Sequence, residues 1–443
     1  MRFNRLSDWL AWQEGLHYKS VDLGLERIGR VAARLGMDAK PTFSIISVAG
    51  TNGKGSCVAL LESILGQAGY RVCAYTSPHL LRYNERVRIM GQEASDGKLI
   101  QAFEEIDRAR GDTTLTYFEF GTLAAMMLFF RAKPDVAVLE VGVGGRLDAV
   151  NLFDADLALV TTIGIDHVAW LGHDRGTIGR EKAGIYRAKR PAVCGDPRPP
   201  LSLVEHARSI GAPLYRAGKD FWFSPNTAGG WHWDSRLDGA YRGLPKPMLP
   251  GGHQLRNAAA VLMAVRLLRD RFPVSEAALR RGLRRVALPG RFQMFRGKDG
   301  VTGILDVAHN QESARALARM LGEQPIDGRT LAVFAILEDK EIEAVLRAMR
   351  SVVDAWHVSD LDALRGARAD NIMKVMSRIG MNAHTLPATT VSDAYGNALQ
   401  SAKPGDRIVI FGSFHTVGEV LKLSISSSDR DRMEIPNLDL AGW

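Results

Sequence analysis

Short apolar runs alternate with segments of helical period along most of the chain, and this alternation limits the fold more than any other feature. Helical patterns separate the runs, and the clearest covers Ser56–Gln67, where apolar residues fall on one face. In the first part of the chain the runs predict strands at Ser44–Ala49, Arg71–Tyr75, Val136–Val141, Leu157–Thr162 and Pro191–Cys194. Strands and helices that alternate in this way are typical of a parallel sheet covered by helices.

The alternation is interrupted once and then starts again, which predicts two domains. Residues Phe221 to Gly252 are rich in Trp, Gly and Pro and predict a short β-rich excursion, followed by a helix at Leu255–Arg269. The second series predicts a strand ending at Val307, strands at Thr330–Leu337, Ala355–Ser359 and Arg407–Gly412, and helices at Gln311–Leu321 and Ile342–Met349. Because 443 residues exceed what one hydrophobic core usually serves, we predict two domains in this α/β protein. Its expected parts are a parallel-sheet domain at 1–288, a hinge at 289–302, a smaller Rossmann-like α/β domain at 303–423 and a polar tail at 424–443.

The composition is that of an ordinary globular protein, with 46% hydrophobic and 24% charged residues. The longest apolar stretch, Phe120 to Phe130, is far shorter than the ~20 residues of a membrane-spanning helix, so we expect a buried helix and no membrane partner. The N-terminal residues carry Asp8 and Glu14 and lack the pattern of a signal peptide, and the three cysteines form no C-x-x-C pair. We therefore expect a cytoplasmic protein, acting as a monomer.

The formal net charge of +8 predicts a surface that attracts anions such as nucleotides or carboxylates. The basic residues are scattered rather than gathered in one run. This distribution favours small anionic ligands, and we expect no nucleic-acid partner.

A glycine-rich loop joins the first predicted strand directly to the helix at Ser56–Gln67. Such a junction directs backbone N–H groups and the positive end of the helix toward a phosphate, while Lys54 supplies a cation for the outer phosphates. The pattern departs from the P-loop consensus at Val48 and Gly55, so a glycine-rich turn without a ligand stays an alternative. The loop predicts a P-loop-type ATPase domain. Its nucleotide-binding residues are expected to be Gly50, Thr51, Asn52, Gly53, Lys54, Gly55 and Ser56.

Motifs spread over the whole chain extend this interpretation. The loop AGTNGKGS is similar to the nucleotide loop of the Mur ligase superfamily, whose members form amides through acyl phosphates. In chain order there follow YTSPHLLRYNERV, YFEFGTLAA, LEVGVGGRLDAVN, TTIGIDH, IGREKAGIYR, HQLRNAAA, LPGRFQ, LDVAHN and GSFHTV. Together these motifs resemble the bifunctional dihydrofolate synthase/folylpolyglutamate synthase family. The resemblance implies an ATP-dependent ligase that adds L-glutamate to dihydropteroate and to the glutamyl tail of reduced folates.

Three candidate metal ligands each follow a predicted parallel strand, so they are expected at one edge of the sheet beside the phosphate loop. The resemblance implies these three residues, Ser77, Glu140 and His167, as Mg²⁺ ligands. Residue chemistry alone supports Glu140 best, because a carboxylate neutralises a cation directly, whereas a histidine is a poor Mg²⁺ ligand and is more often structural. The expected cofactors are ATP and two Mg²⁺ ions, with a monovalent cation as a further candidate.

Lys182 lies within the motif IGREKAGIYR. As an ammonium group it would repel Mg²⁺ but could pair with the γ-phosphate of ATP. In the family the matching lysine is carbamylated, and the resemblance therefore implies that Lys182 becomes a carboxylate-like metal ligand. An ordinary solvated lysine stays an alternative.

The pterin-binding residues are implied by the resemblance. It predicts a pocket in which an aromatic face stacks on the pterin ring and a carboxylate meets its N–H donors. A core role for Phe118 stays an alternative to stacking, and Val150 replaces a threonine that is common in the motif. The residues implied are Asp22, Leu23, Gly24, Phe118, Leu147, Asp148 and Ala149.

The resemblance also implies nucleotide contacts outside the loop. Asn257 and Arg291 match nucleotide contacts, and Asp306 matches a residue that reaches the nucleotide from the second domain. Arg291 could instead form a structural ion pair, but a guanidinium beside a transferring phosphoryl group would stabilise its charge. The residues expected to act in catalysis are Lys54, Lys182 and His309.

Several other functions agree less well with the motifs. A cell-wall Mur ligase would normally carry a UDP-binding domain before the phosphate loop, and only about 50 residues precede it here. Folylpolyglutamate synthase activity alone stays open, although Asp148-Ala149 and the segment DLGLER resemble the bifunctional form. LEVGVGGRLD is no dinucleotide fingerprint, because Leu147 stands where the last glycine belongs. A nucleotide-dependent nucleic-acid-binding protein, suggested by the loop and the charge, is the alternative from another class.

Overall fold

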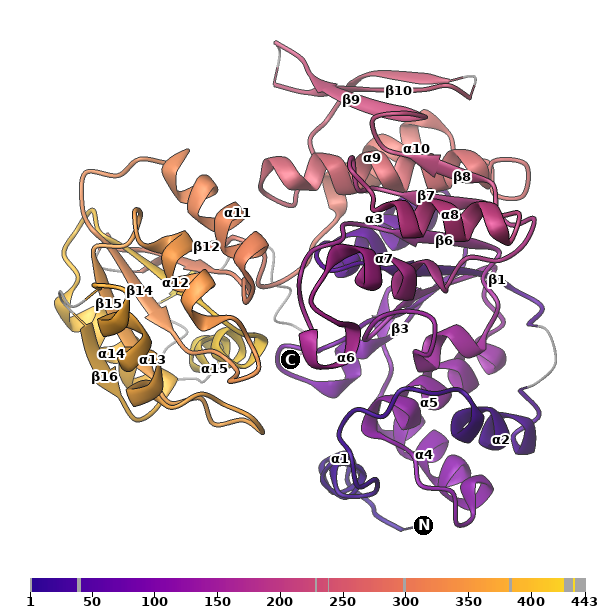
Figure 1. The fold of residues 1–443 in the computed structure, drawn as a ribbon, viewed down its shortest axis with the longest axis horizontal. Coiled ribbons are helices and arrows are strands. Elements are labelled where there is room, and N and C mark those ends of the chain that lie inside the picture. Colours follow the sequence, from indigo (N-terminus) through magenta and orange to yellow (C-terminus); the bar gives the residue numbers. More distant parts are fainter. Residues whose placement is uncertain are drawn as a thin grey trace. The chain divides into compact units, whose positions relative to one another are not determined.

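The structure is a computed structural model that describes residues 2–37, 41–227, 229–237, 239–297, 300–381, 385–425 and 433–434. The chain divides into two compact units, which Figure 1 colours from indigo to salmon and from orange to yellow. The first unit consists of Met1–His79, Tyr83–Met248 and Gln254–Val286. The second consists of Leu80–Arg82, Leu249–His253 and Ala287–Trp443. The domain limits expected from the sequence stay predictions.

The first unit is built on an eight-stranded sheet with the strand order β4-β3-β2-β5-β1-β6-β7-β8. Its centre, β1, is wholly buried and pairs in parallel with β5 and β6, whereas β3 runs antiparallel to β2 and to β4. The strands are β1 (Ser44–Ala49), β2 (Val72–Tyr75), β3 (Val87–Ile89), β4 (Gln92–Glu93), β5 (Val136–Glu140), β6 (Leu157–Val160), β7 (Ala192–Cys194) and β8 (Leu214–Arg216). The parallel sheet predicted from the apolar runs is thus confirmed.

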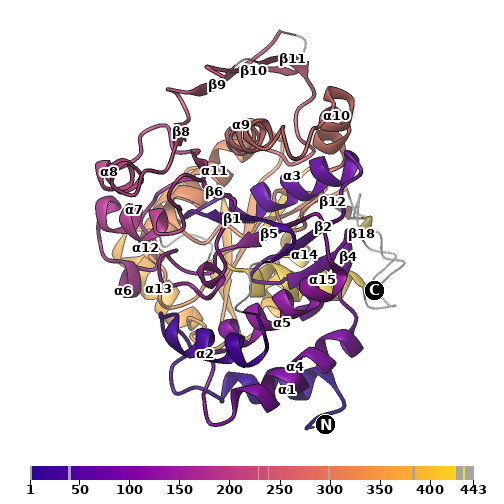
Figure 2. The same cartoon turned by 90° about the vertical axis from the view of Figure 1, so that its right-hand side faces the viewer.

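Helices cover both faces of this sheet (Figures 1 and 2). On one face α3 packs with α9 and α10, and on the other α5 packs with α1, α2 and α4. The helices are α1 (Leu6–Glu14), α2 (Glu26–Arg34), α3 (Lys54–Gln67), α4 (Asp96–Arg110), α5 (Tyr117–Ala132), α6 (Val168–Leu171), α7 (Arg175–Ala183), α8 (Leu201–Ser209), α9 (Gly252–Leu267), α10 (Glu276–Arg285) and the short 3₁₀ helices η1 (Tyr83–Arg86) and η2 (Ala149–Leu152).

The longest apolar stretch of the sequence lies in α5, as expected for a buried helix. Thr116 and Glu119 begin this helix with a capping box, in which each side chain binds the backbone N–H of the other. Within the described residues, no helix combines the length and the apolar character needed to cross a membrane.

The β-rich excursion is a three-stranded antiparallel sheet, as the sequence predicted. It consists of β9 (Phe221–Pro225), β10 (Trp231–Ser235) and β11 (Ala240–Leu244). The buried Trp233 donates its indole N–H to the carbonyl of Ala259 at 3.1 Å, which attaches this sheet to α9.

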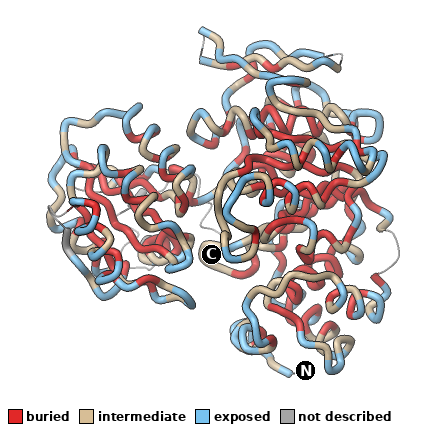
Figure 3. The backbone as a smooth tube through the Cα atoms, viewed as in Figure 1, coloured by how far each residue is buried: buried red, intermediate tan, exposed pale blue. Residues whose placement is uncertain are grey.

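The second unit holds a seven-stranded sheet with the order β16-β15-β14-β17-β13-β12-β18. Each face has its own apolar core, covered by α11, α12 and α13 on one side and by α14 and α15 on the other. Figure 3 shows the buried backbone concentrated in the strands of both units. The strands are β12 (Gln293–Gly297), β13 (Thr302–Leu305), β14 (Thr330–Phe334), β15 (Ala355–Ser359), β16 (Thr385–Ala388), β17 (Arg407–Phe411) and β18 (Met433–Glu434). The helices are α11 (Gln311–Gly322), α12 (Ile342–Met349), α13 (Ala369–Arg378), α14 (Val391–Ser401) and α15 (Phe414–Ile425).

Three strands of this sheet, β12, β16 and β18, were not predicted. β12 lies in the range 289–302 that the sequence analysis assigned to a hinge, and it runs antiparallel to β13. β18 lies in the expected polar tail and pairs with β12 through Met433 and Glu434. Residues 426–432 and 435–443 of that tail lie outside the described residues.

Close packing of α3 on α10 gives the first testable prediction. A Cβ atom at Gly282 of α10 would lie 2.6 Å from the Cα of Ile64 on α3. The change Gly282→Ala should therefore lower the free energy of unfolding in urea by about 1–3 kcal/mol. Gly66→Ala on α3 is the matched control, because no atom lies within 4 Å of its new Cβ, and it should stabilise by roughly 0.5–1 kcal/mol. Equal stabilities of the two variants would contradict the packing.

Candidate active site

The carboxyl ends of four parallel strands form one edge of the first sheet. Val48 of β1 is in register with Glu140 of β5, and the next residue, Ala49, with Val160 of β6. On the far side of β5, Tyr75 of β2 lies beside Leu139. The segments that leave this edge carry the phosphate loop and the three candidate metal ligands Ser77, Glu140 and His167, as expected for side chains that follow parallel strands.

The phosphate loop is held in place by the segment that follows β6. The backbone N–H of Thr51 donates to the carbonyl of Thr162 at 2.7 Å, and the hydroxyl of Thr161 donates to the carbonyl of Asn52 at 2.6 Å. Gly53 has φ +88°, in the left-handed region that favours glycine. These contacts support the shape of the loop, and the two supporting threonines were not predicted.

A chain of buried amides connects α9 to the loop. The side-chain amide of Asn257 donates to Gln254 at 2.9 Å, and that of Gln254 donates to the hydroxyl of Ser56 at 3.2 Å. A Cβ atom at Gly53 would lie 2.6 Å from the amide oxygen of Asn257. The structure thus brings the predicted nucleotide residue Asn257 to the loop, and it adds Gln254, which the sequence analysis missed.

Two lysines share one backbone acceptor at the start of the loop. The ammonium of Lys54 lies 3.1 Å from the carbonyl oxygen of Gly50, and the amine of Lys182 lies 3.0 Å from the same oxygen. Lys182 is 3% exposed. Burial and the nearby charge of Lys54 together lower the pKa of Lys182 to about 7, although Asp166 and Asp148 act in the opposite direction. The Lys182 side chain is therefore easily neutralised.

The candidate metal ligands offer a donor set that fits Mg²⁺. Glu140 is buried, and its carboxylate accepts the backbone N–H of Ser77 at 3.2 Å, which places the Ser77 segment beside it. His167 has φ +52° at the start of α6, and its backbone N–H donates to the Asp166 carboxylate at 2.8 Å. A hydroxyl and a carboxylate are oxygen ligands of the kind that Mg²⁺ prefers. A free amine at Lys182 does not fit such a set, whereas a carbamate would.

The predicted pterin-binding residues gather at the N-terminus of α5. The backbone N–H of Gly24 donates to the carbonyl of Leu147 at 3.1 Å, which joins the segments Asp22–Gly24 and Leu147–Ala149. The half-buried ring of Phe118 lies 5.8 Å from the ring of Tyr75. A Cβ atom at Gly142 would lie 2.7 Å from the same Phe118 ring. The Phe118 ring therefore lies beside Tyr75 and Gly142, and the turn Asp22–Gly24 lies beside Leu147.

Asp148 closes the turn that follows β5. Its carboxylate accepts the backbone N–H groups of Val143 at 2.9 Å and of Val150 at 3.0 Å. Burial raises the pKa of Asp148 to about 7, although these hydrogen bonds and the charge of Lys54 act in the opposite direction. A contact of this carboxylate with a pterin ring stays a prediction.

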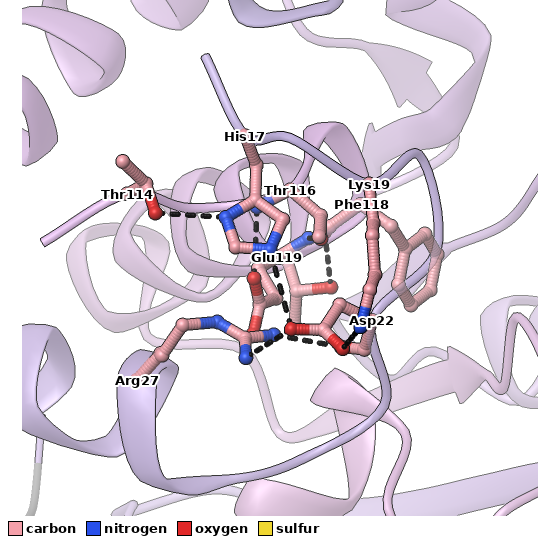
Figure 4. A network of polar contacts seen from close by, with 9 residues as sticks. His17, Lys19, Asp22, Arg27, Thr114, Thr116, Phe118 and Glu119 are labelled. Atoms are coloured by element: carbon pink, nitrogen blue, oxygen red, sulfur yellow. Dashed lines mark hydrogen bonds and ion pairs between the residues drawn. The ribbon is translucent and has the colours of Figure 1, made fainter.

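Asp22 belongs to a network of polar side chains that the sequence analysis did not foresee (Figure 4). Arg27 donates to the Asp22 carboxylate, to the Asp22 carbonyl at 2.7 Å and to Glu119 at 3.0 Å. His17 lies 3.2 Å from the same Asp22 carboxylate. Burial opposes ionisation of Asp22, but Arg27, His17 and Lys19 outweigh it and hold the pKa of Asp22 below its usual range. In the sequence, the network could have been suspected from Arg27, a cation five residues after Asp22 in the segment DLGLER.

The remaining candidate residues lie in the second unit. The carboxylate of Asp306 accepts the backbone N–H groups of Phe292 at 2.9 Å and of Ala308 at 2.8 Å. Burial raises its pKa, although Arg291 acts in the opposite direction. The guanidinium of Arg291 lies 5.1 Å from the ring of Phe414, and Nδ1 of His309 lies 2.8 Å from the carbonyl of Val307. Contacts of these residues with a nucleotide stay predictions.

Comparison with known proteins identifies the family. Residues 290–414 match the family model described as the Mur ligase, glutamate ligase domain. The dihydrofolate synthase/folylpolyglutamate synthase of Escherichia coli is 45% identical over 418 residues, which cover 94% of this chain and 95% of that protein. The protein of the same name from Bacillus subtilis is 30% identical over 95% of this chain and 99% of its own length.

Solved structures agree with these relatives. The structure of E. coli FolC in complex with DHPP and ADP matches with a TM-score of 0.88 and 44% identity, over 95% of this chain and 97% of that chain. The structure of a bifunctional folylpolyglutamate synthase/dihydrofolate synthase with Mn, AMPPNP and L-glutamate bound matches with a TM-score of 0.86 and 44% identity. The match covers 95% of this chain and 98% of that chain. The chain therefore belongs to the dihydrofolate synthase/folylpolyglutamate synthase family of ATP-dependent ligases.

Proposed function

We propose that this chain joins L-glutamate to dihydropteroate and to the glutamyl tail of reduced folates, at the expense of ATP. One observation carries the proposal: the first unit holds both the phosphate loop, which Thr161 and Thr162 support, and the predicted pterin-binding residues, with Phe118 beside Tyr75 and Gly24 bonded to Leu147. The ligands bound by similar structures, DHPP, ADP, AMPPNP and L-glutamate, support the same assignment.

The phosphate loop would bind the phosphates of ATP. The ammonium of Lys54 now donates to the carbonyls of Gly50 and Thr51, and it would exchange these contacts for the outer phosphates. Ser77, Glu140, His167 and a carbamylated Lys182 would hold Mg²⁺ at two sites, where the metal neutralises the charge on the transferring phosphoryl group. The Mn²⁺ bound in a similar structure supports a divalent metal for this chain.

The proposed reaction has two steps. A carboxylate oxygen of the folate substrate attacks the γ-phosphorus of ATP, the bond to the bridging oxygen breaks, and ADP leaves. The amine nitrogen of glutamate then attacks the acyl phosphate carbon, the bond from carbon to the phosphate oxygen breaks, and the nitrogen loses a proton. Lys54 would stabilise the charge of the first step by its position beside the phosphates.

For the second unit we propose a role in binding nucleotide and glutamate. Its candidate residues are Arg291, Asp306 and His309, and the match of residues 290–414 to a glutamate ligase domain supports this role. Arg291 carries a permanent positive charge suited to phosphate. The backbone N–H groups that bind Asp306 fix the direction of its carboxylate.

A mass-resolved assay with ATP, Mg²⁺ and L-glutamate tests the function. Dihydropteroate and a reduced folate are offered in separate reactions, and phosphate release is followed beside product mass. We expect each substrate to gain one glutamyl unit for each phosphate released. If only the reduced folate gains a glutamyl unit, the protein is a folylpolyglutamate synthase without dihydrofolate synthase activity. If neither substrate gains one, the proposed function is wrong.

We further propose that the protein acts as a monomer in the cytoplasm. Its cysteines, Cys57, Cys73 and Cys194, are buried thiols, which supports a reducing compartment. Salt-dependent binding of oligonucleotides in the absence of glutamate-dependent ATP turnover would favour the nucleic-acid-binding alternative instead.

A further inference from the structure

A largely buried ion pair joins two elements that are 92 residues apart in the sequence, and its position points to a role in substrate binding. We propose that Arg27 and Glu119 are a positioning pair, which fixes the turn Asp22–Gly24 against the N-terminus of α5 and thereby sets the affinity for the pterin end of the substrate. This inference rests on the function proposed above. It concerns residues that bind no substrate themselves but hold those that do.

The contacts of Arg27 reach both sides of this junction. One guanidinium nitrogen donates to the Asp22 carboxylate, while the other donates to the Asp22 carbonyl at 2.7 Å and to Glu119 at 3.0 Å. The side chain of Glu119 is 4% exposed and that of Arg27 is 22% exposed. Charges that are largely removed from water interact more strongly than surface pairs, and losing one partner leaves the other charge unpaired. Arg27 therefore holds the backbone and the side chain of the turn together.

Glu119 ties the same pair to the helix that carries Phe118. Its second carboxylate oxygen accepts the backbone N–H of Thr116 at 2.8 Å, and the Thr116 hydroxyl accepts the backbone N–H of Glu119 at 3.2 Å. Phe118 lies between these two residues in the sequence. The carboxylate that receives Arg27 therefore also fixes the first turn of α5 (Figure 4).

A second connection joins the same turn to the same helix. The ring of His17 lies 3.2 Å from the Asp22 carboxylate through Nε2 and 2.7 Å from the Thr114 hydroxyl through Nδ1. Thr114 precedes the helix cap at Thr116 by two residues. The turn is thus attached to the entrance of α5 from two directions, and Arg27 is the attachment with the most contacts.

The expected consequence is confined to one end of the substrate. The phosphate loop is held by Thr161 and Thr162, which are outside this network, so loss of the pair should leave ATP binding unchanged. Dihydropteroate lacks a glutamyl tail and depends on its pterin end more than a reduced folate does. Loss of Arg27 should therefore weaken the binding of dihydropteroate more than the binding of the reduced folate.

The test uses three single variants, one double variant and a control on the full-length protein. Arg27→Met removes the charge, Arg27→Lys keeps it with a single donor group, and Glu119→Gln keeps a side chain suited to the capping box while removing the negative charge. The control is Arg131→Met, because Arg131 pairs with Glu105 at the other end of α5, where both side chains are exposed. KM and kcat are measured for dihydropteroate, a reduced folate, ATP and glutamate, together with the thermal midpoint.

We expect Arg27→Met and Glu119→Gln to raise KM for dihydropteroate by roughly 10- to 100-fold, with KM for ATP and glutamate unchanged. Arg27→Lys should recover part of the loss, and the double variant Arg27→Met/Glu119→Gln should be no worse than Arg27→Met alone, because Arg27→Met already removes the ion pair with Glu119. Additive effects would overturn the inference. So would an unchanged KM for dihydropteroate, or a parallel loss for all substrates with a lower thermal midpoint.

Calorimetric binding of dihydropteroate without turnover separates the two possible failures. If the wild-type protein binds it and Arg27→Met binds it more weakly, the positioning role stands even if no glutamyl product forms and the proposed function fails. If the two proteins bind it equally, the positioning role is wrong while the function is unaffected. If the wild-type protein does not bind it, both are wrong.

Discussion

Replacing Lys182 with alanine should reduce ligase turnover by at least roughly 10²–10³-fold without unfolding the protein, because it removes a group that we propose as a metal ligand. The amine of Lys182 shares the carbonyl oxygen of Gly50 with the ammonium of Lys54. Two ammonium groups at one oxygen repel each other. Burial and this repulsion lower the pKa of Lys182 to about 7, so the chain holds an amine that loses its proton near neutral pH.

A neutral amine is the form that reacts with CO₂. The nitrogen lone pair attacks the carbon, an N–C bond forms, one C=O bond opens to an oxyanion, and the nitrogen releases a proton. The resulting carbamate carries a negative charge, which turns the repulsion with Lys54 into attraction. As the pH falls through about 7 the amine becomes protonated and can no longer add CO₂, so the modified fraction and the activity should decline together.

Native mass spectrometry measures the modification directly. The wild-type protein should carry the added mass of one CO₂, which is lost with the activity in CO₂-depleted buffer and returns with bicarbonate. Acetate or propionate should restore part of the activity of Lys182→Ala by supplying the missing carboxylate. Lys219→Ala, at an exposed lysine, is the control and should behave as wild type. Full activity of Lys182→Ala, or of wild type without CO₂, would show that the carbamate is not needed.

The sequence was sufficient to predict the parallel sheet and the edge where the candidate site lies. The central strand Ser44–Ala49 is buried along its whole length and carries no charged residue, and its bounds are confirmed residue by residue. Because parallel strands end at a common edge, the sequence analysis expected the motifs that follow them to lie together there. In the structure, Val48 at the end of β1 is in register with Glu140 at the end of β5.

The parts that the sequence could not reveal depend on contacts between distant residues. β18 has two residues, too few for any periodicity, and its pairing with β12 is a tertiary contact. Arg27 lies on the nine-residue helix α2, and its partner Glu119 is 92 residues away in the sequence. Gln254 reaches Ser56 across 198 residues. The contacts of a side chain in such a network form only in the completed fold. No local sequence pattern therefore predicts them.

Lys54→Met should lower kcat/KM by roughly 10²–10³-fold, because the phosphate loop loses the cation that we propose for the outer phosphates of ATP. The loss should appear with every acceptor, since the phosphoryl transfer step is common to both substrates. Binding of dihydropteroate should fall much less than kcat/KM, because the turn Asp22–Gly24 is held by Arg27 and Leu147 and Lys54 acts on this region only through its charge on Asp148. Steady-state kinetics with both acceptors and calorimetry with dihydropteroate alone distinguish these expectations.

The same variant also tests the coupling between the two lysines. Removing the positive charge of Lys54 should raise the pKa of Lys182, because that charge lowers it in the wild-type protein. A higher pKa leaves less neutral amine at neutral pH, and a carbamate at Lys182 would also lose its positively charged neighbour. Both effects have the same sign, so the CO₂ adduct of Lys54→Met should be smaller than that of wild type at the same pH and bicarbonate concentration. Lys54→Arg keeps the charge and should retain the adduct, whereas an adduct of equal size in Lys54→Met would show that the shared carbonyl of Gly50 does not couple the two side chains.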